Sequence, residues 1–126
     1  VKVARRWRKV LGGGRRQAGI LAAAGIVALT DHVDRLAEDH ANAALLATGL
    51  AQIDELEVAS VQTNMVFVSL GYTTSVLLAD YLKQRGILIP RGDTIRLVTH
   101  LDVSKEDINT VVEAIKQFAS MPAAHQ

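Results

Sequence analysis

Three consecutive glycines lie among basic side chains in residues 9–17, and this combination suits a phosphate group. Gly12–Gly14 have no side chains, so the backbone there can approach a ligand closely. The pattern predicts a helix from about Arg15, and the unpaired N–H groups and positive dipole end at its start would favour an anion. Lys9, Arg15 and Arg16 add full positive charges. This segment is therefore the first candidate for a binding site.

The same segment lacks the signatures of the common nucleotide sites. It has no Gly-Lys-Ser/Thr ending, which excludes a Walker loop, and no strand is predicted before the glycines, as a dinucleotide fingerprint requires. From composition alone, a glycine hinge beside a solvated basic face explains residues 9–17 slightly better than a phosphate site. A targeting segment and a non-specific nucleic-acid contact also stay open for residues 1–30.

Arg96 is the second candidate, because an arginine in the middle of an apolar strand is costly unless it is paired. Strand alternation places Arg96 and His100 on one face and Ile95 on the other. A guanidinium can bind a carboxylate through two parallel hydrogen bonds, so a ligand carboxylate is one partner. A salt bridge to Asp102 or Glu106, or a position at the sheet edge, is the plainer alternative.

The other polar residues give weaker signals. His32 and His40 lie eight positions apart, whereas two ligands of one metal on a helix need a spacing of three or four. A turn explains the tripeptide Arg91–Asp93. The chain has no cysteine, which excludes a disulfide, a thiolate metal site and a cysteine nucleophile, and suits a reducing cytosol. No metal site is predicted.

Charge and hydropathy limit the class of protein further. Seven of the 14 Lys and Arg residues lie in the first 16 positions, and the first acidic residue is Asp31. Hydrophobic residues make up 49% of the chain, which argues against disorder, and aromatic residues only 4%, which argues against a base-stacking platform. The longest apolar run, Ala18–Leu29, has 12 residues, fewer than the roughly 20 that span a membrane. The basic start at Val1 predicts a processed or truncated piece.

Periodicity predicts the elements that must position these residues. The expected elements are helices over 3–11, 15–29 and 31–49, a polar connection over 54–62 with room for a short strand near Val58, a strand over 64–70, a helix ending at Arg85, strands over 87–89 and 94–101, and a helix over 105–119. The order predicts an α/β fold, with a sheet of a few strands covered by helices.

Finer details of these elements follow from residue type. The helix over Ala18–Leu29 is apolar on nearly every side and is expected to be buried all round. The next helix is expected to bury one row of side chains, which comprises Val33, Leu36, His40, Ala44 and Ala47. Thr74 or Ser75 can cap the following helix, and Ser104 with Asp107 forms a capping box for the last one. The tail, residues 120–126, is expected to fray.

Four blocks of the sequence resemble, in the same order, blocks of the low-specificity L-threonine aldolases. These blocks are RRWRKVLGGGRRQAGILAAAG (Arg5–Gly25), DRLAEDHANA (Asp34–Ala43), QTNMVFV (Gln62–Val68) and IRLVTHLDVS (Ile95–Ser104). The resemblance extends over almost the whole chain. One departure is Arg15, where the family usually has Met, and this adds charge beside the glycines.

This resemblance implies a fold-type I enzyme that depends on pyridoxal phosphate and cleaves L-threonine or L-allo-threonine to glycine and acetaldehyde. It implies that the chain is the C-terminal part alone, because the family's Schiff-base lysine, its ring-stacking histidine and its pyridine-binding aspartate lie upstream. No catalytic residue is therefore expected here. Residues 1–29 would be connecting helices and a glycine loop that pack on a large domain or a second subunit, and residues 30–126 the small α/β domain.

The resemblance also assigns roles to three residues. Arg16 matches the arginine that contacts the cofactor phosphate, and Lys9 matches a basic residue that can serve a neighbouring subunit's cofactor. Arg96 matches the arginine that holds the substrate α-carboxylate. The parent is expected to be a cytoplasmic homotetramer with active sites between subunits, without nucleic acid or membrane. A related β-eliminating amino-acid lyase, and a non-catalytic module that binds phosphate or nucleic acid, remain alternatives.

Overall fold

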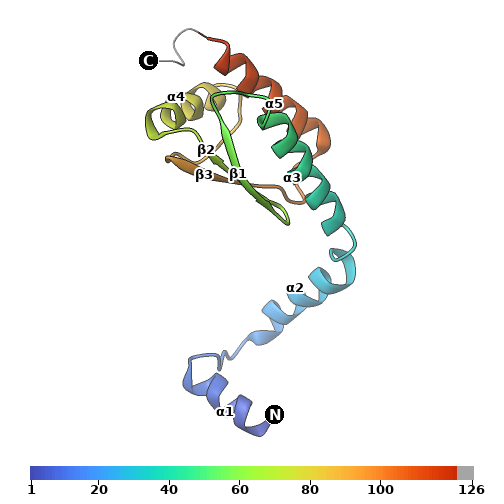
Figure 1. Cartoon of the computed structure of the whole chain (residues 1–126). Coiled ribbons are helices and arrows are strands. Elements are labelled where there is room, and N and C mark those ends of the chain that lie inside the picture. Colours follow the sequence, from blue (N-terminus) through green and yellow to red (C-terminus); the bar gives the residue numbers. More distant parts are fainter. Residues whose placement is uncertain (122–126) are drawn as a thin grey trace. The chain divides into compact units, whose positions relative to one another are not determined.

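The computed structural model describes residues 1–121, and the chain divides into two structural units between Arg35 and Leu36. Figure 1 traces both units, each of which is described by itself below. The tail that was expected to fray lies largely outside the described residues, since residues 122–126 are not described.

The first unit contains two helices separated by the glycines, as predicted. Helix α1 runs over Lys2–Val10 and α2 over Ala18–Asp31, so α2 begins three residues later than expected. Gly12 has a φ of 82° and donates its N–H to the Lys9 carbonyl at 3.2 Å. The Gly13 N–H donates to the Arg8 carbonyl at 2.8 Å. This pair of bonds is a Schellman motif, in which the left-handed residue closes the helix.

Helix α2 is exposed on every side within the described chain. Ile20 is 76% exposed and Leu29 is 75% exposed. Leaving so many large apolar side chains in water forgoes about 1.5–3 kcal/mol for each one. Residues 1–35, which form the first unit, therefore provide no cover for this helix, and its burial stays a prediction that requires another surface.

The second unit is a three-stranded antiparallel sheet packed against helices, which agrees with the predicted α/β class. The strands are β1 (Glu57–Gln62), β2 (Met65–Ser69) and β3 (Thr94–Val98), in the order β1-β2-β3. The helices are α3 (Leu36–Leu50), α4 (Tyr72–Lys83) and α5 (Lys105–Ala119), and Figure 1 shows them beside the sheet. Val66, Val68 and Ile95 of the sheet join side chains of all three helices in one buried core.

The predicted buried face of α3 is wrong in all but one position. The buried residues are Asp39, Asn42, Ala43, Leu46, Ala47 and Leu50, of which only Ala47 was expected. Two long-range hydrogen bonds set this orientation, since the Thr99 hydroxyl donates to the Asp39 carbonyl at 2.6 Å and the Asn42 side chain donates to the Val103 carbonyl at 3.1 Å. Buried polar groups are tolerated where they are paired in this way. Helix α3 also begins at Leu36 rather than at Asp31, because Asp31 is the last residue of α2.

The strand predictions are partly wrong. The short strand allowed near Val58 is present and longer than expected, since β1 takes up residues 57–62 of the predicted connection and the two-residue turn after Gln62 folds it back onto β2. Residues 87–89, expected as a strand, have no strand pairing. The Ile87 N–H instead donates to the Leu82 carbonyl at 3.0 Å, which closes the end of α4. Strand β3 ends at Val98 rather than Leu101.

The cap predicted for α4 is also wrong. Helix α4 begins at Tyr72 after Gly71, which has a φ of 76°. The Tyr72 N–H donates to the Asp93 carboxylate at 3.0 Å, so a side chain from a distant turn acts as the cap. The buried Ser75 hydroxyl bonds within the helix, to the Tyr72 carbonyl at 2.7 Å. Sequence reasoning considers local caps and therefore could not find this one.

The capping box predicted for α5 is confirmed. The Asp107 N–H donates to the Ser104 hydroxyl oxygen at 3.1 Å, while the Ser104 hydroxyl and N–H donate to the Asp107 carboxylate at 2.7 and 2.9 Å. The bond from the Ser104 hydroxyl, followed by the bond from its N–H, holds the pKa of Asp107 below its ordinary value of 3.8.

Replacing Ser104 by alanine should lower the free energy of unfolding by about 1 kcal/mol, because the Asp107 N–H loses its acceptor. Denaturant unfolding at pH 7 measures this difference.

Asp107→Asn should also be destabilising at pH 7. A lowered folded pKa means that the contribution of Asp107 is complete above pH 3.8 and disappears as the pH falls through the folded pKa. Denaturant unfolding at pH 7 and pH 3 should therefore give a smaller difference between parent and Asp107→Asn at the lower pH. An equal difference at both pH values would contradict this role.

Helices α3 and α5 pack closely at Gly49. A Cβ atom built on Gly49 would lie 2.7 and 2.8 Å from the two methyl groups of Val112, which is buried. Such distances are far inside van der Waals contact, so glycine is required there by the neighbouring helix rather than by its own backbone conformation.

Gly49→Ala should lower the free energy of unfolding by about 1–2 kcal/mol, because overpacking outweighs the better helix propensity of alanine. The matched control is the same substitution in a Val112→Ala background, where the two methyl groups are gone. There it should be neutral or stabilising. Thermal and denaturant unfolding of the four proteins measures the coupling, and a Gly49→Ala protein as stable as its parent would contradict the close contact.

Candidate functional site

The glycines of segment 9–17 have a structural role that the sequence left open. Gly12 and Gly13 form the Schellman motif that ends α1, and a Cβ on Gly13 would lie 2.7 Å from Cγ of Arg8 and 2.9 Å from its carbonyl oxygen. These two glycines are thus accounted for by the end of the helix. Gly14 has no such role, since its built Cβ meets only the flexible Lys9 side chain, at 3.3 Å.

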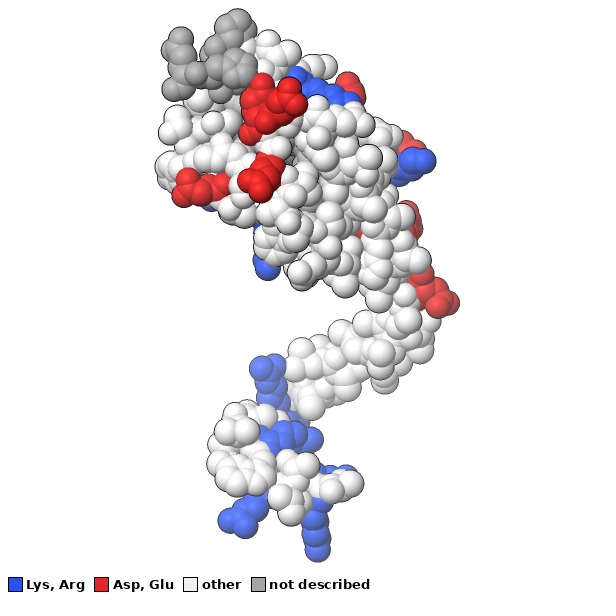
Figure 2. Space-filling view, in the orientation of Figure 1, with Lys and Arg blue, Asp and Glu red and all other residues white. Residues whose placement is uncertain are grey.

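The groups after the glycines keep their capacity for an anion. Gln17 precedes α2 without a side-chain hydrogen bond to the helix, so the first-turn N–H groups are uncapped. Lys9, Arg15 and Arg16 are all exposed. Figure 2 shows Lys and Arg side chains gathered on α1 and the glycine segment with no acidic side chain among them. This donor set fits a phosphate group, such as that of the expected cofactor.

Arg96 lies on β3 as predicted, on the sheet face opposite the buried core. Ile95 and Thr99 are buried, whereas Arg96 and His100 are exposed, which confirms the expected alternation. Phe67 of β2 is the residue paired with Arg96. Strand β3 is an edge strand, so exposure to water explains why an unpaired arginine is tolerated there.

Arg96 has no ion pair within residues 1–121, which overturns the alternative of a structural salt bridge to Asp102 or Glu106. Asp102 instead lies near His100, with 3.7 Å between the carboxylate and Nδ1. The Asp102 N–H donates to the same Nδ1 at 3.3 Å. The Arg96 guanidinium is therefore available for a carboxylate.

The turn before β3 anchors the strand that carries Arg96, and sequence reasoning missed this function. The Asp93 carbonyl accepts the N–H groups of Leu70 and Gly71 at 3.0 and 3.3 Å, in addition to the cap that its carboxylate makes on α4. Arg91 pairs with Asp80 at 2.6 Å. The predicted turn over 91–93 is a bend at Gly92 and Asp93 without a turn hydrogen bond among the described residues. The acidic residue directly before a strand was the only signal in the sequence for its anchoring role.

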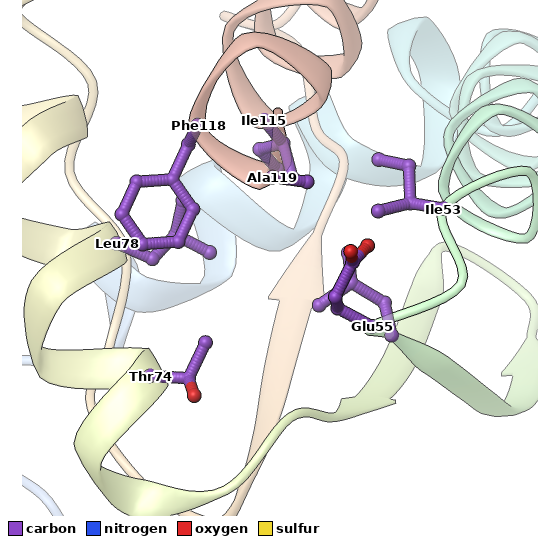
Figure 3. Close-up of a pocket in the computed structure, with 8 residues that line it drawn as sticks. Ile53, Glu55, Thr74, Leu78, Ile115, Phe118 and Ala119 are labelled. Carbon is purple, nitrogen blue, oxygen red and sulfur yellow. The ribbon is translucent and has the colours of Figure 1, made fainter. Parts of the chain in front are cut away.

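Two hollows of the second unit differ in character. The first, shown in Figure 3, lies between α4, α5 and the loop after α3, and holds only about 10 Å³, roughly one water. Its lining is apolar apart from Thr74 and Glu55. The second is a groove of about 420 Å³ beside β3, lined by Arg96 and by residues 86–90 among others. The second is the larger of these two and carries the charge of Arg96.

Other kinds of site are not found in the described part. Within residues 1–121, no three His, Asp or Glu side chains are grouped so as to hold a metal ion. No helix among these residues is both long enough and apolar enough to cross a membrane. Lys9 and Arg16 lie in the first unit and Arg96 in the second, so the roles of all three stay predictions.

Comparison with known proteins places the chain in a family. Residues 1–72 match the family of beta-eliminating lyases. Over 118 residues the chain is 48% identical to the low specificity L-threonine aldolase of Escherichia coli K12, which covers 94% of the chain and 35% of that protein. It is 38% identical over 124 residues to low-specificity L-threonine aldolase 1 of Arabidopsis thaliana, covering 93% and 35% respectively.

A more distant relative agrees with these. The chain is 30% identical over 118 residues to a probable low-specificity L-threonine aldolase of Schizosaccharomyces pombe, covering 93% of the chain and 30% of that protein. The chain thus spans about a third of the length of the curated relatives it matches. Since the family match covers more than half of its residues, the chain belongs to the beta-eliminating lyase family.

Proposed function

We propose that the chain is part of a pyridoxal-phosphate-dependent aldolase that cleaves L-threonine and L-allo-threonine to glycine and acetaldehyde. The observation that carries this proposal is the 48% identity over 94% of the chain to a low specificity L-threonine aldolase. The exposed, unpaired Arg96 and the basic start of α2 support it, because a carboxylate and a phosphate are the two anions that such an enzyme must hold.

In this proposal Arg16 and the uncapped first turn of α2 hold the cofactor phosphate. A guanidinium offers several N–H donors in a fixed plane, and the helix adds N–H groups and a positive dipole end. Lys9 contributes a further positive charge, either in its own subunit or toward the cofactor of a neighbour. The chemistry that pyridoxal phosphate supplies when bound is an electron sink for the carbanion left by the broken Cα–Cβ bond.

Arg96 binds and orients the substrate. Two parallel hydrogen bonds from its guanidinium fix the plane of the α-carboxylate, and this limits rotation about the bond between the carboxylate and Cα. Orientation of this kind determines which of the bonds at Cα is broken.

The exposed helix α2 fits an arrangement in which the first unit packs on a large domain or on a second subunit. Its apolar side chains would then be buried, and its basic start would lie at an active site between subunits. We propose that the full-length protein is a cytoplasmic homotetramer. Sedimentation of that protein would measure its oligomeric state.

The family match favours one alternative chemistry, the elimination of a β-substituent. Product analysis with the full-length protein separates the two. With L-threonine, aldolase chemistry yields equal amounts of glycine and acetaldehyde, whereas β-elimination yields a 2-oxo acid and ammonia. Aromatic and sulfur amino acids should not be cleaved. Formation of a 2-oxo acid as the main product from threonine would overturn the proposed function.

Arg96→Ala in the full-length protein should raise KM for L-threonine about tenfold to a hundredfold and lower kcat/KM at least as much. The reason is the loss of charged hydrogen bonds worth about 1.5–3 kcal/mol. Lys83→Ala is the control, because Lys83 is an exposed basic residue at the end of α4, away from β3 in the sequence. Acetaldehyde release measures both. Near-normal KM and kcat/KM for Arg96→Ala would contradict the carboxylate role.

Arg16→Ala should weaken binding of pyridoxal phosphate by about tenfold to a hundredfold, because one charged phosphate contact is lost. Dialysis followed by measurement of the cofactor's absorbance gives the dissociation constant. Lys2→Ala is the control, since Lys2 is equally exposed but lies at the far end of α1. Equal cofactor affinity of the Arg16→Ala and Lys2→Ala proteins would count against the assignment.

A further inference from the structure

The outer edge of β3 carries a row of unpaired backbone groups. The Leu70 N–H donates to the Asp93 carbonyl and the Thr99 N–H to the Asn64 carbonyl, both at 3.0 Å, at the two ends of the β2–β3 ladder. In an antiparallel pair, alternate residues point their N–H and C=O groups toward the partner strand. Residues 93, 95, 97 and 99 therefore face β2, and the backbone groups of residues 94, 96 and 98 face away from it.

No backbone hydrogen bond within the described chain reaches these outward groups. Strand β3 also lacks the usual protection of an edge strand, since it has no bulge, proline or lysine and Arg96 is its only charged residue. Val98, at the end of the edge, is an apolar side chain that is 40% exposed. Such an edge readily accepts a further strand.

A second segment without a sheet partner borders the same groove. Residues 86–90 line it together with β3, and Ile87–Ile89 has the β-forming composition of a strand but no sheet partner. Leu88 is 79% exposed. The groove of about 420 Å³ is therefore lined by two backbone segments with unpaired groups and by apolar side chains.

We propose that an extended segment from the rest of the longer polypeptide, outside residues 1–126, pairs with the outer edge of β3 and adds a fourth strand to the sheet. About two thirds of the length of the relatives lies outside the matched region, so ample chain exists to supply it. Alternate side chains of this segment would pack on Ile89 and Leu97 on one face and lie beside Arg96 on the other.

A second copy of β3 is a poorer occupant. Two copies of this five-residue strand gain most hydrogen bonds when they pair about its central residue, Arg96. That register would place two guanidinium groups opposite each other on one face, and like charges in that position are destabilising. The inference rests on the length of the family members and not on the aldolase activity.

Hydrogen exchange of the full-length protein, resolved to single amides, tests the proposal. If a strand covers the edge, the amides of Arg96 and Val98 should exchange as slowly as those of Ile95 and Leu97, at least a hundredfold slower than unstructured peptide. The alternation along β3 is an internal control, because Ile95 and Leu97 are bonded to β2 in either case. Fast exchange at Arg96 and Val98 with slow exchange at Ile95 and Leu97 would overturn the proposal.

A photo-reactive amino acid in place of Leu88 identifies the occupant in the same protein. Peptide mapping should find a cross-link to a segment outside residues 1–126. A cross-link from Leu88 to residues 1–126 of a second polypeptide, seen as a dimer on a denaturing gel, or protection of Arg96 and Val98 that is lost on dilution, would indicate a second copy of the chain and overturn the proposal. Neither experiment measures activity, so a failure of the strand proposal would not affect the proposed function, which product analysis tests separately.

Discussion

One buried side chain, Thr99, connects three parts of the second unit. It is 1% exposed, and its hydroxyl lies 2.6 Å from the Asp39 carbonyl of α3 and 3.3 Å from the Asn64 carbonyl of the hairpin turn. Its own carbonyl accepts the Asn64 side-chain amide at 2.8 Å. An unpaired buried hydroxyl costs about 1–3 kcal/mol, so separating these groups would destabilise the unit. The rotation of α3, the hairpin turn and the end of β3 are thus determined at one place.

This dependence explains which features of the fold can be predicted from the sequence. The capping box of α5 is local, since Ser104 and Asp107 are three residues apart, and it forms as predicted. The buried face of α3 depends on Thr99, which lies 60 residues away from Asp39. Apolar spacing alone selected His40 and Ala44, because nothing near α3 in the sequence indicates that Asp39 and Asn42 would be buried with partners.

The same distinction applies to the candidate site. Strand alternation correctly placed Arg96 on the exposed face, and composition correctly located the basic segment around Arg16. The anchoring of β3 by Asp93 escaped prediction, because its partners on α4 are about 20 residues away. The strand over residues 87–89 was expected from its β-branched composition, but composition cannot supply a pairing partner. The outer edge of β3, which borders the same groove, is also unpaired. A strand that pairs with residues 87–89 would therefore lie beside that edge.

The close contact at Gly49 also limits how this family can vary in sequence. Because the methyl groups of Val112 occupy the space that a side chain at position 49 would need, the two positions cannot change independently. A lineage that acquires alanine at position 49 keeps its stability only if it first or simultaneously acquires a smaller residue at position 112. The order of the two changes is therefore restricted during evolution, since passing through Gly49→Ala alone leads through a less stable protein. Positions 49 and 112 should therefore covary among homologues, because they share one contact between two helices.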